Sequence, residues 1–476
     1  MNVNLNKRDT DRATHHRVSR RDFLRLATGS AAVGGAALAQ VPGKAAAQVE
    51  KTAAAAMTKQ RERFPFDLRN DSTPFDEING IQFGGPATRD PKFRKQMMGY
   101  AFKAFDDNRP GYSQLDYALR RGAFLLKFKA ISEGLHLDQH MLDLSDMPAP
   151  PRLKKLFSGK GRLPGKKPGH MLDVLKGDFV HPKQYRFADR RQAARAIKQA
   201  ARLYGADLVG ITPRDPRFDF GRLWDPIKLE SWEWDQFPFV PKSVIVLGFE
   251  MDYEAISAAP SFLADAATGE GYSQTVKTAY QLAVFLKNLG YQAVPVENEL
   301  GLSIPYAELA GLGEHGRHGL LITHKYGPRV RIGKVYTDFD FVEYDRPVNL
   351  GVVEFCKRCK RCADQCPTKA ITFDDEPGYD PSYNVEGNWF NNRGVKKFYN
   401  NTLDCWKWWA ENGESCASCI TSCPFNKPDF WHHRLVHDLN ALMPGPLHSF
   451  MRDMDKVFGY GDTFDPKAAA RFWNKG

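Results

Sequence analysis

All eight cysteines of the chain lie between residues 356 and 423, in two sets of four, and each set is followed by a proline. The first set is Cys356, Cys359, Cys362 and Cys366, and the second is Cys405, Cys416, Cys419 and Cys423. The gaps are two, two and three residues in the first set and ten, two and three in the second. Cysteine thiolates are soft ligands that bind zinc or iron, so this segment is the first candidate for metal chemistry.

The first set reproduces the C-x2-C-x2-C-x3-C-P run of bacterial ferredoxins, in which the fourth cysteine ligates the cluster of the other set. We therefore expect two [4Fe–4S] clusters. One would be held by Cys356, Cys359, Cys362 and Cys423, and the other by Cys366, Cys405, Cys416 and Cys419. The alternatives are structural zinc and four disulfides in an exported protein, although neither accounts for two proline-terminated sets of four.

The N-terminal stretch carries the three regions of an export signal in the correct order. Residues 19–25 read SRRDFLR, which resembles the twin-arginine motif, and residues 26–43 are uncharged and rich in alanine and glycine. Ala45–Ala47 then offers a small-residue cleavage site. We expect a signal peptide at 1–47 and export by the twin-arginine translocase to the periplasm or the outer face of the cytoplasmic membrane. The alternative is a disordered tail with a chance Arg-Arg pair.

The formal net charge of +11 falls to +6 once the eight basic and three acidic residues of 1–47 are set aside. No basic stripe interleaved with aromatic residues is present, so we expect no nucleic-acid partner. No segment after the signal is apolar enough to span a bilayer. Membrane attachment of the mature protein would therefore require a partner.

Residues 181 onward show strands alternating with helices, which predicts an α/β (α+β) core. Asp189 can cap a helix that Gly205 ends. The apolar run Val244–Leu247 is typical of a strand buried on both faces. We also expect strands at 207–212 and 291–296, a helix at 272–289 ended by Gly290, and earlier helices near 91–105 and 113–132.

Together, the signal, the core and the cysteine module resemble the corrinoid-dependent reductive dehalogenases of organohalide respiration, over nearly the whole chain. Four blocks carry the resemblance: TGEGY at 268–272, LGYQA at 289–293, AGLG at 310–313 and GPRVR at 327–331. The resemblance implies a nitroreductase-like core that binds a base-off corrinoid, with a ferredoxin-like module inserted. The expected units are the signal at 1–47, an N-terminal unit at 48–180, the core at 181–349 with an insertion at about 213–241, the module at 350–427 and a C-terminal unit at 428–476.

The resemblance also implies site residues. Tyr272 matches the catalytic tyrosine, Arg331 the basic residue beside it, Asn298 the active-site asparagine and Thr268 a pocket threonine. Phe398, between the two cysteine sets, is a further candidate for an apolar substrate pocket. In an unrelated protein these residues would be a packing tyrosine, a solvated strand charge, a turn residue and core aromatics.

These residue types suit removal of halide from carbon, which consumes two electrons and a proton. Cobalt(I) would activate the carbon–halogen bond, Tyr272 would supply the proton, and Arg331 would favour the tyrosinate that remains. The expected partners are a small-molecule organohalide, a small integral-membrane anchor subunit and a respiratory electron donor. The competing functions are an exported iron–sulfur electron-transfer protein and an epoxyqueuosine reductase-like corrinoid enzyme.

Overall fold

The computed structural model describes residues 59–60, 65–70, 72, 74, 76, 105–124, 180–225, 230–383, 390–428, 440 and 445–474. The signal peptide and the helix expected near 91–105 therefore lie outside the described residues, except for Phe105. Within the described residues, no helix is both long enough and apolar enough to cross a membrane.

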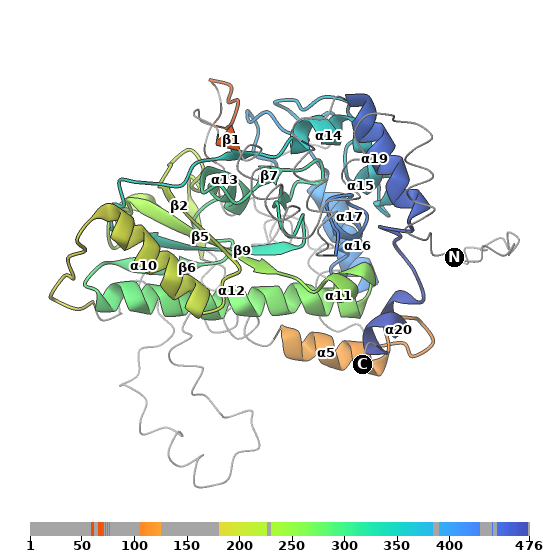
Figure 1. Cartoon of the computed structure of the whole chain (residues 1–476), viewed down its shortest axis with the longest axis horizontal. Helices are drawn as coiled ribbons and strands as arrows, with labels where there is room; N and C mark the ends of the chain where they lie inside the picture. Colours follow the sequence, from red (N-terminus) through yellow and green to blue (C-terminus); the bar gives the residue numbers. More distant parts are fainter. Residues whose placement is uncertain are drawn as a thin grey trace, which may run out of the picture.

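A four-stranded antiparallel sheet in the order β2-β5-β9-β6 forms the centre of the fold. Its strands are β2 (Leu208–Pro213), β5 (Ser243–Glu250), β9 (Val330–Thr337) and β6 (Ala293–Val296). Figure 1 shows α12 (Phe262–Asn288) running along the sheet, with the helices of the cysteine module gathered at one end. The mixed α and β class is thus confirmed, and the strand pairing makes the core α+β.

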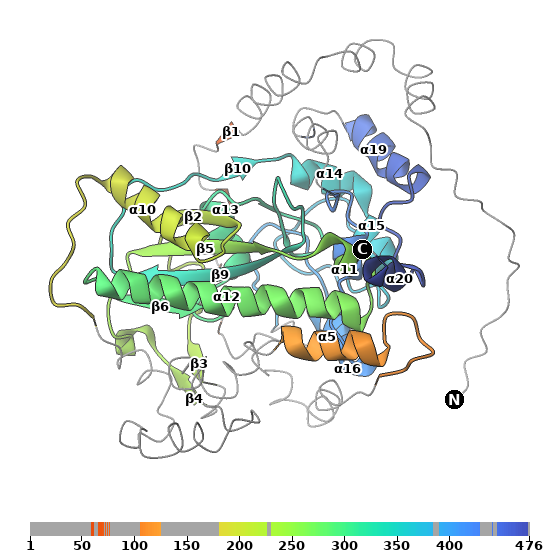
Figure 2. The same cartoon turned by 60° about the horizontal axis from the view of Figure 1, so that its bottom comes forward.

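The remaining elements connect and cover this core. They are β1 (Lys59–Gln60), α5 (Gln114–Ala123), α10 (Arg190–Leu203), β3 (Leu223–Asp225), β4 (Glu230–Trp232), η4 (Trp234–Gln236), α11 (Tyr253–Ser257), α13 (Ser303–Leu309), β7 (Glu314–His315), β8 (Leu321–Ile322), β10 (Val348–Asn349), α14 (Val352–Cys359), α15 (Arg361–Gln365), α16 (Thr402–Asn412), α17 (Ser418–Thr421), α19 (Gly445–Val457) and α20 (Ala468–Trp473). In the second view, α5 lies beside one end of α12 and α19 lies beside α14 (Figure 2).

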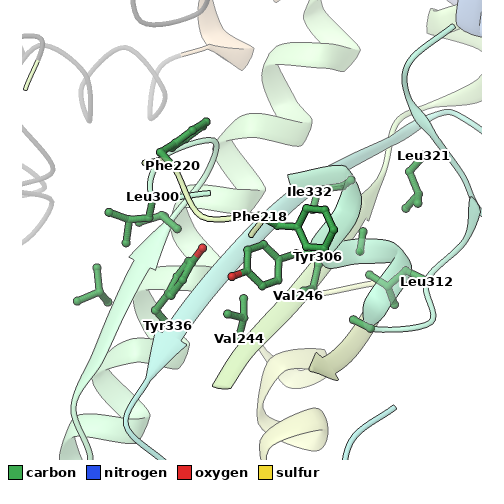
Figure 3. Packing of buried hydrophobic residues seen from close by; sticks show 14 of the residues in the cluster. Phe218, Phe220, Val244, Val246, Leu300, Tyr306, Leu312, Leu321, Ile332 and Tyr336 are labelled. Atoms are coloured by element: carbon green, nitrogen blue, oxygen red, sulfur yellow. The ribbon is translucent and has the colours of Figure 1, made fainter. Parts of the chain in front are cut away.

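Strand β5 is buried on both faces, as its apolar run predicts, because its alternate side chains enter two different cores. Ile245 and Leu247 pack with apolar residues of α10 and α12 on one face. Val244 and Val246 pack on the other face with α13 and the aromatic excursion at 213–241. Figure 3 shows that second core, where Phe218 of the excursion lies near Tyr306 and Phe220 lies near Leu300.

Helix α10 follows the sequence closely. The Asp189 side chain accepts a hydrogen bond from the Gln192 amide at 2.6 Å, the contact expected of an N-cap. Gly205 follows with a φ of 114°, a backbone conformation that favours glycine. Helix α5 also begins as expected, with Ser113 and Asp116 forming a capping box.

The start of α12 differs from the sequence prediction by ten residues. The helix begins at Phe262, where Ser261 caps it, instead of at Tyr272. Gly269 and Gly271 disfavour helix in isolation, but here each allows a close approach. A Cβ on Gly269 would collide with the ring of Phe124, and one on Gly271 would lie 2.5 Å from Cγ of Arg331. Tyr272 is therefore in the interior of a helix whose glycines are selected by packing.

Candidate active site

Tyr272 and Arg331 form the centre of the candidate site. Nη1 of Arg331 donates a hydrogen bond to the Tyr272 hydroxyl at 3.4 Å. The guanidinium carbon also lies 5.1 Å from the centre of the tyrosine ring, within the range of a cation–π contact. Helix α12 supplies the tyrosine and the start of β9 supplies the arginine, so the pair depends on the packing of α12 against the sheet.

Met251 joins the pair to Thr268, and nothing in its sequence position indicates this role. Nε of Arg331 donates to the Met251 sulfur at 3.3 Å, and the Thr268 hydroxyl donates to the same atom at 3.8 Å. Met251 and Thr268 are buried, whereas Tyr272 and Arg331 are half-buried. The Tyr272–Arg331 pair thus packs against buried residues and remains partly exposed.

Arg329 fixes the backbone around Met251. Its guanidinium donates to the Met251 carbonyl at 3.0 Å and to the Lys427 carbonyl at 3.3 Å, and it forms an ion pair with Glu250. The Arg329 side chain is 1% exposed. Since Lys427 follows the last cysteine, Arg329 links the end of β5 to the cysteine module.

Cys419 of the second cysteine set lies near the Tyr272–Arg331 pair. Burial and the nearby Cys366 raise the pKa of the Cys419 thiol to about 12, while the charge of Arg331 acts in the opposite direction. Cys419 also packs against the apolar cluster that contains Met251. Met251 therefore lies between Arg331 and the cluster against which Cys419 packs.

The other expected site residues divide into two groups. Asn298 is half-buried and lies two residues beyond the end of β6. Because β6 runs antiparallel to β9, Asn298 lies at the same end of the sheet as Arg331. Phe398 packs with Cys356, Cys359 and Cys423, and the guanidinium carbon of Arg317 lies 4.1 Å from the centre of its ring. Its expected role in a substrate pocket stays a prediction.

Four cysteines line one cavity in the module: Cys356, Cys359, Cys362 and Cys423. They are the four that the ferredoxin pattern assigns to one cluster, including the crossover of Cys423. Burial raises the pKa of the Cys356 thiol to about 11 and that of the Cys359 thiol to about 12. Thiolates are stable in such a place only with a compensating cation, so this donor set fits an iron–sulfur cluster.

The other four cysteines approach one another in the same module. Cys405 and Cys419 pack against the buried Cys366. Burial is the main factor that raises the pKa of the Cys405 thiol, and the negative charges of Cys419 and Cys366 raise this pKa further. Burial likewise raises the pKa of the Cys416 thiol, and the negative charges of Glu414 and Cys419 raise it further. Three of these four cysteines thus share a hydrophobic cluster that also contains Cys362, and Cys416 lies near Cys419.

Comparison with known proteins agrees with this architecture. Residues 355–427 match the family described as a 4Fe-4S dicluster domain, and residues 10–42 match the twin-arginine signal of the ubiquinol–cytochrome c reductase iron–sulfur subunit. The fold and module therefore define an exported iron–sulfur protein. The predicted twin-arginine signal is confirmed.

Relatives that match most or about half of the chain identify its family. The tetrachloroethene reductive dehalogenase of Dehalobacter restrictus is 35% identical over 419 residues, covering 80% of this chain and 75% of the relative. That of Sulfurospirillum multivorans is 34% identical over 292 residues, covering 56% of each chain. This chain belongs to the reductive dehalogenase family, whose members are oxidoreductases that act on carbon–halogen bonds. The resemblance predicted from the sequence blocks is thus confirmed.

Solved structures support the fold. A catabolic reductive dehalogenase in complex with 3-bromo-4-hydroxybenzoic acid matches with a TM-score of 0.58 and 19% identity, over 88% of this chain and 52% of that one. This chain thus spans about half the length of the solved structure that it matches. The epoxyqueuosine reductase of Lactococcus garvieae is 41% identical over 73 residues, which is 15% of this chain.

Proposed function

We propose that this chain removes halide from a small organohalide by corrinoid-dependent reduction. Two [4Fe–4S] clusters would relay the electrons and Tyr272 would supply the proton. The overall reaction converts R–X, two electrons and one proton into R–H and X⁻. The single observation that carries the proposal is the Tyr272–Arg331 hydrogen bond near Cys419 of the second cysteine set. It brings a proton donor and an electron relay to the same end of the sheet.

Tyr272 is the proposed acid because its hydroxyl can transfer a proton to the carbon that loses halide. Arg331 holds a permanent positive charge at 3.4 Å from that hydroxyl. The charge favours the tyrosinate left after transfer, and a proton from solvent then restores the tyrosine. Asn298 is proposed to orient the substrate or the hydroxyl by hydrogen bonding, and Thr268 to line the pocket above Met251.

The corrinoid is proposed from family membership together with the partial exposure of the Tyr272–Arg331 pair. Both side chains are half-buried, while Met251 and Thr268 next to them are buried, so part of the pair stays accessible to a ligand. When bound, a corrinoid would contribute reductive cleavage of the carbon–halogen bond. The chain's own residues then bind the substrate, restrict access of water and deliver the proton.

Electrons are proposed to enter at the cluster of Cys356, Cys359, Cys362 and Cys423. They would then pass to the cluster of Cys366, Cys405, Cys416 and Cys419, and from there to the reaction site. The packing of Cys419 against the apolar cluster of Met251 supports this order, because Met251 in turn accepts a hydrogen bond from Arg331. A respiratory donor would supply the electrons. A small integral-membrane subunit would hold the exported enzyme at the membrane.

The test is anaerobic reconstitution followed by metal analysis and halide release. We expect about eight iron atoms per chain for two clusters, one cobalt, and halide release from at least one aliphatic or aromatic organohalide with a low-potential reductant. Iron with sulfide but no cobalt, and no halide release, would indicate an electron carrier. Two zinc atoms with iron near zero would overturn the cluster assignment.

A further inference from the structure

The β7–β8 hairpin of the core contacts the cavity that is lined by Cys356, Cys359, Cys362 and Cys423. Its tip, residues 316–320, is closed by a hydrogen bond from the Gly316 amide to the Leu320 carbonyl at 2.9 Å. The Arg317 amide donates to the Cys356 sulfur at 3.4 Å. The Arg317 side chain is fully buried and donates to the Cys356 carbonyl at 3.0 and 2.8 Å. The hairpin thus contacts a proposed cluster ligand through both backbone and side chain.

His318, the next residue, lines the same cavity as Cys356, Cys359, Cys362 and Cys423. Its side chain is 7% exposed. Nδ1 accepts a hydrogen bond from the Leu320 amide at 3.2 Å, so this nitrogen carries no proton. In a neutral imidazole the proton then lies on Nε2, which becomes a donor.

The Nε2 atom of His318 is buried and has no hydrogen-bond partner within the described part of the chain. An unpaired buried donor is costly, roughly 1–3 kcal/mol. The ring is also held closely in place, since a Cβ on Gly316 would lie 2.8 Å from its Cε1 and 3.2 Å from its Nε2. A fixed, unpaired N–H in a cavity lined by four cysteines calls for an acceptor in that cavity.

We propose that the Nε2–H group of His318 donates a hydrogen bond to a sulfur of the first [4Fe–4S] cluster and thereby raises the reduction potential of that cluster. The inference rests on the proposed function, because it requires the cluster. Hydrogen bonds to cluster and ligand sulfurs are among the factors that set iron–sulfur potentials. The reduced cluster carries one more negative charge than the oxidised one, so the N–H donor stabilises the reduced state more. His318 is a positioning residue that acts through the cluster.

The first experiment is a redox titration of the reconstituted full-length chain, followed by electron paramagnetic resonance. His318→Phe removes the donor and keeps a planar ring. We expect this variant to lower the reduction potential of the Cys356-ligated cluster by about 59 mV, which is a tenfold change in the equilibrium constant of a one-electron couple. The reduction potential of the other cluster should not change. His318→Gln keeps an N–H donor and should restore part of the difference.

His448→Phe is the matched control. His448 is also buried and packs on Phe355, with ring centres 5.3 Å apart, but it is not among the residues that line the cavity. Both potentials should match those of the wild type in this variant. Unchanged potentials in His318→Phe, or equal shifts in His318→Phe and His448→Phe, would overturn the proposal.

A second measurement covers the case in which His318→Phe fails to retain the cluster. Wild-type protein labelled with 15N-histidine is reduced, and hyperfine spectroscopy of its clusters should show a 15N coupling and an exchangeable proton. An exchangeable proton without a 15N coupling would indicate a bridging water and overturn the proposal. Iron near zero in wild-type protein would instead overturn the proposed function, and this inference with it.

Discussion

Gly271 and Arg331 touch so closely that the helix and the strand carrying them have no room for a methyl group between them. A Cβ on Gly271 would lie 2.5 Å from Cγ and 3.2 Å from Cβ of Arg331. The residue that precedes the proposed acid therefore determines how closely the neighbouring cation approaches it. Arg331 can approach this closely only because Gly271 has no side chain.

Gly271→Ala should displace Arg331 and separate it from Tyr272. We expect a clear loss of halide release and a loss of about 1–3 kcal/mol of stability from overpacking. Gly122→Ala is the matched control, because Gly122 is also helical but has nothing within 4 Å of an added Cβ. It should gain about 0.4–1 kcal/mol. Thermal unfolding and activity of both variants test this, and equal behaviour would contradict the close approach.

Tyr272→Phe should retain both clusters and the corrinoid but lose about 10²- to 10⁴-fold in rate, the range for a positioned general acid. Ring packing survives in this variant and only the hydroxyl is lost. Tyr280→Phe, on the same helix and also half-buried, should remain near the wild-type rate. A wild-type rate for fully loaded Tyr272→Phe would mean that another group delivers the proton.

Substitutions at Arg331 should separate charge from geometry. Arg331→Lys keeps the positive charge but loses the planar fork, whereas Arg331→Met removes the charge. We expect activity to fall in the order wild type, Arg331→Lys, Arg331→Met, with cofactor content measured in each. Equal activity in the two variants would exclude an electrostatic role.

Paired cysteine substitutions should reveal the crossover of ligands. Cys356→Ser combined with Cys423→Ser affects one cluster only, so about four of about eight iron atoms should remain. Cys416→Ser combined with Cys423→Ser affects both clusters and should leave less iron. Iron analysis of the two double variants tests this. If the Cys356/Cys423 variant retained less iron than the Cys416/Cys423 variant, each sequential set would hold its own cluster.

Replacing Arg20 and Arg21 by lysine should retain the folded precursor in the cytoplasm, because the twin-arginine route depends on that pair. Cell fractionation with detection of the chain provides the measurement. Processing and export at the wild-type level would show that the chain reaches the outside by another route.

Local patterns predicted much of this molecule. Short-range patterns predicted the cap at Asp189 and the burial of Val244–Leu247 on both faces of the strand. The cysteine spacing likewise predicted that Cys356, Cys359, Cys362 and Cys423 come together, and they line one cavity. Tyr272 and Arg331, 59 positions apart, were paired by family resemblance and do lie in contact.

Long-range packing set the features that sequence could not predict. The first ten residues of α12 contain two glycines, whose helical state depends on Phe124 and Arg331. Met251 and His318 acquire their positions through partners from other elements, and neither belongs to a spaced motif. Phe398 was placed by its location between the cysteine sets, and its neighbours are Arg317 and the first cysteine group.

The burial of Arg317 has a consequence for protein engineering. Its guanidinium is 0% exposed and donates to the Cys356 and Thr372 carbonyls, yet it belongs to a hairpin outside the 350–427 segment. Excising that segment as a miniature ferredoxin would remove the donors to both carbonyls and open the cavity wall formed by Arg317 and His318. A transplantable electron-transfer unit from this protein would therefore have to include the β7–β8 hairpin.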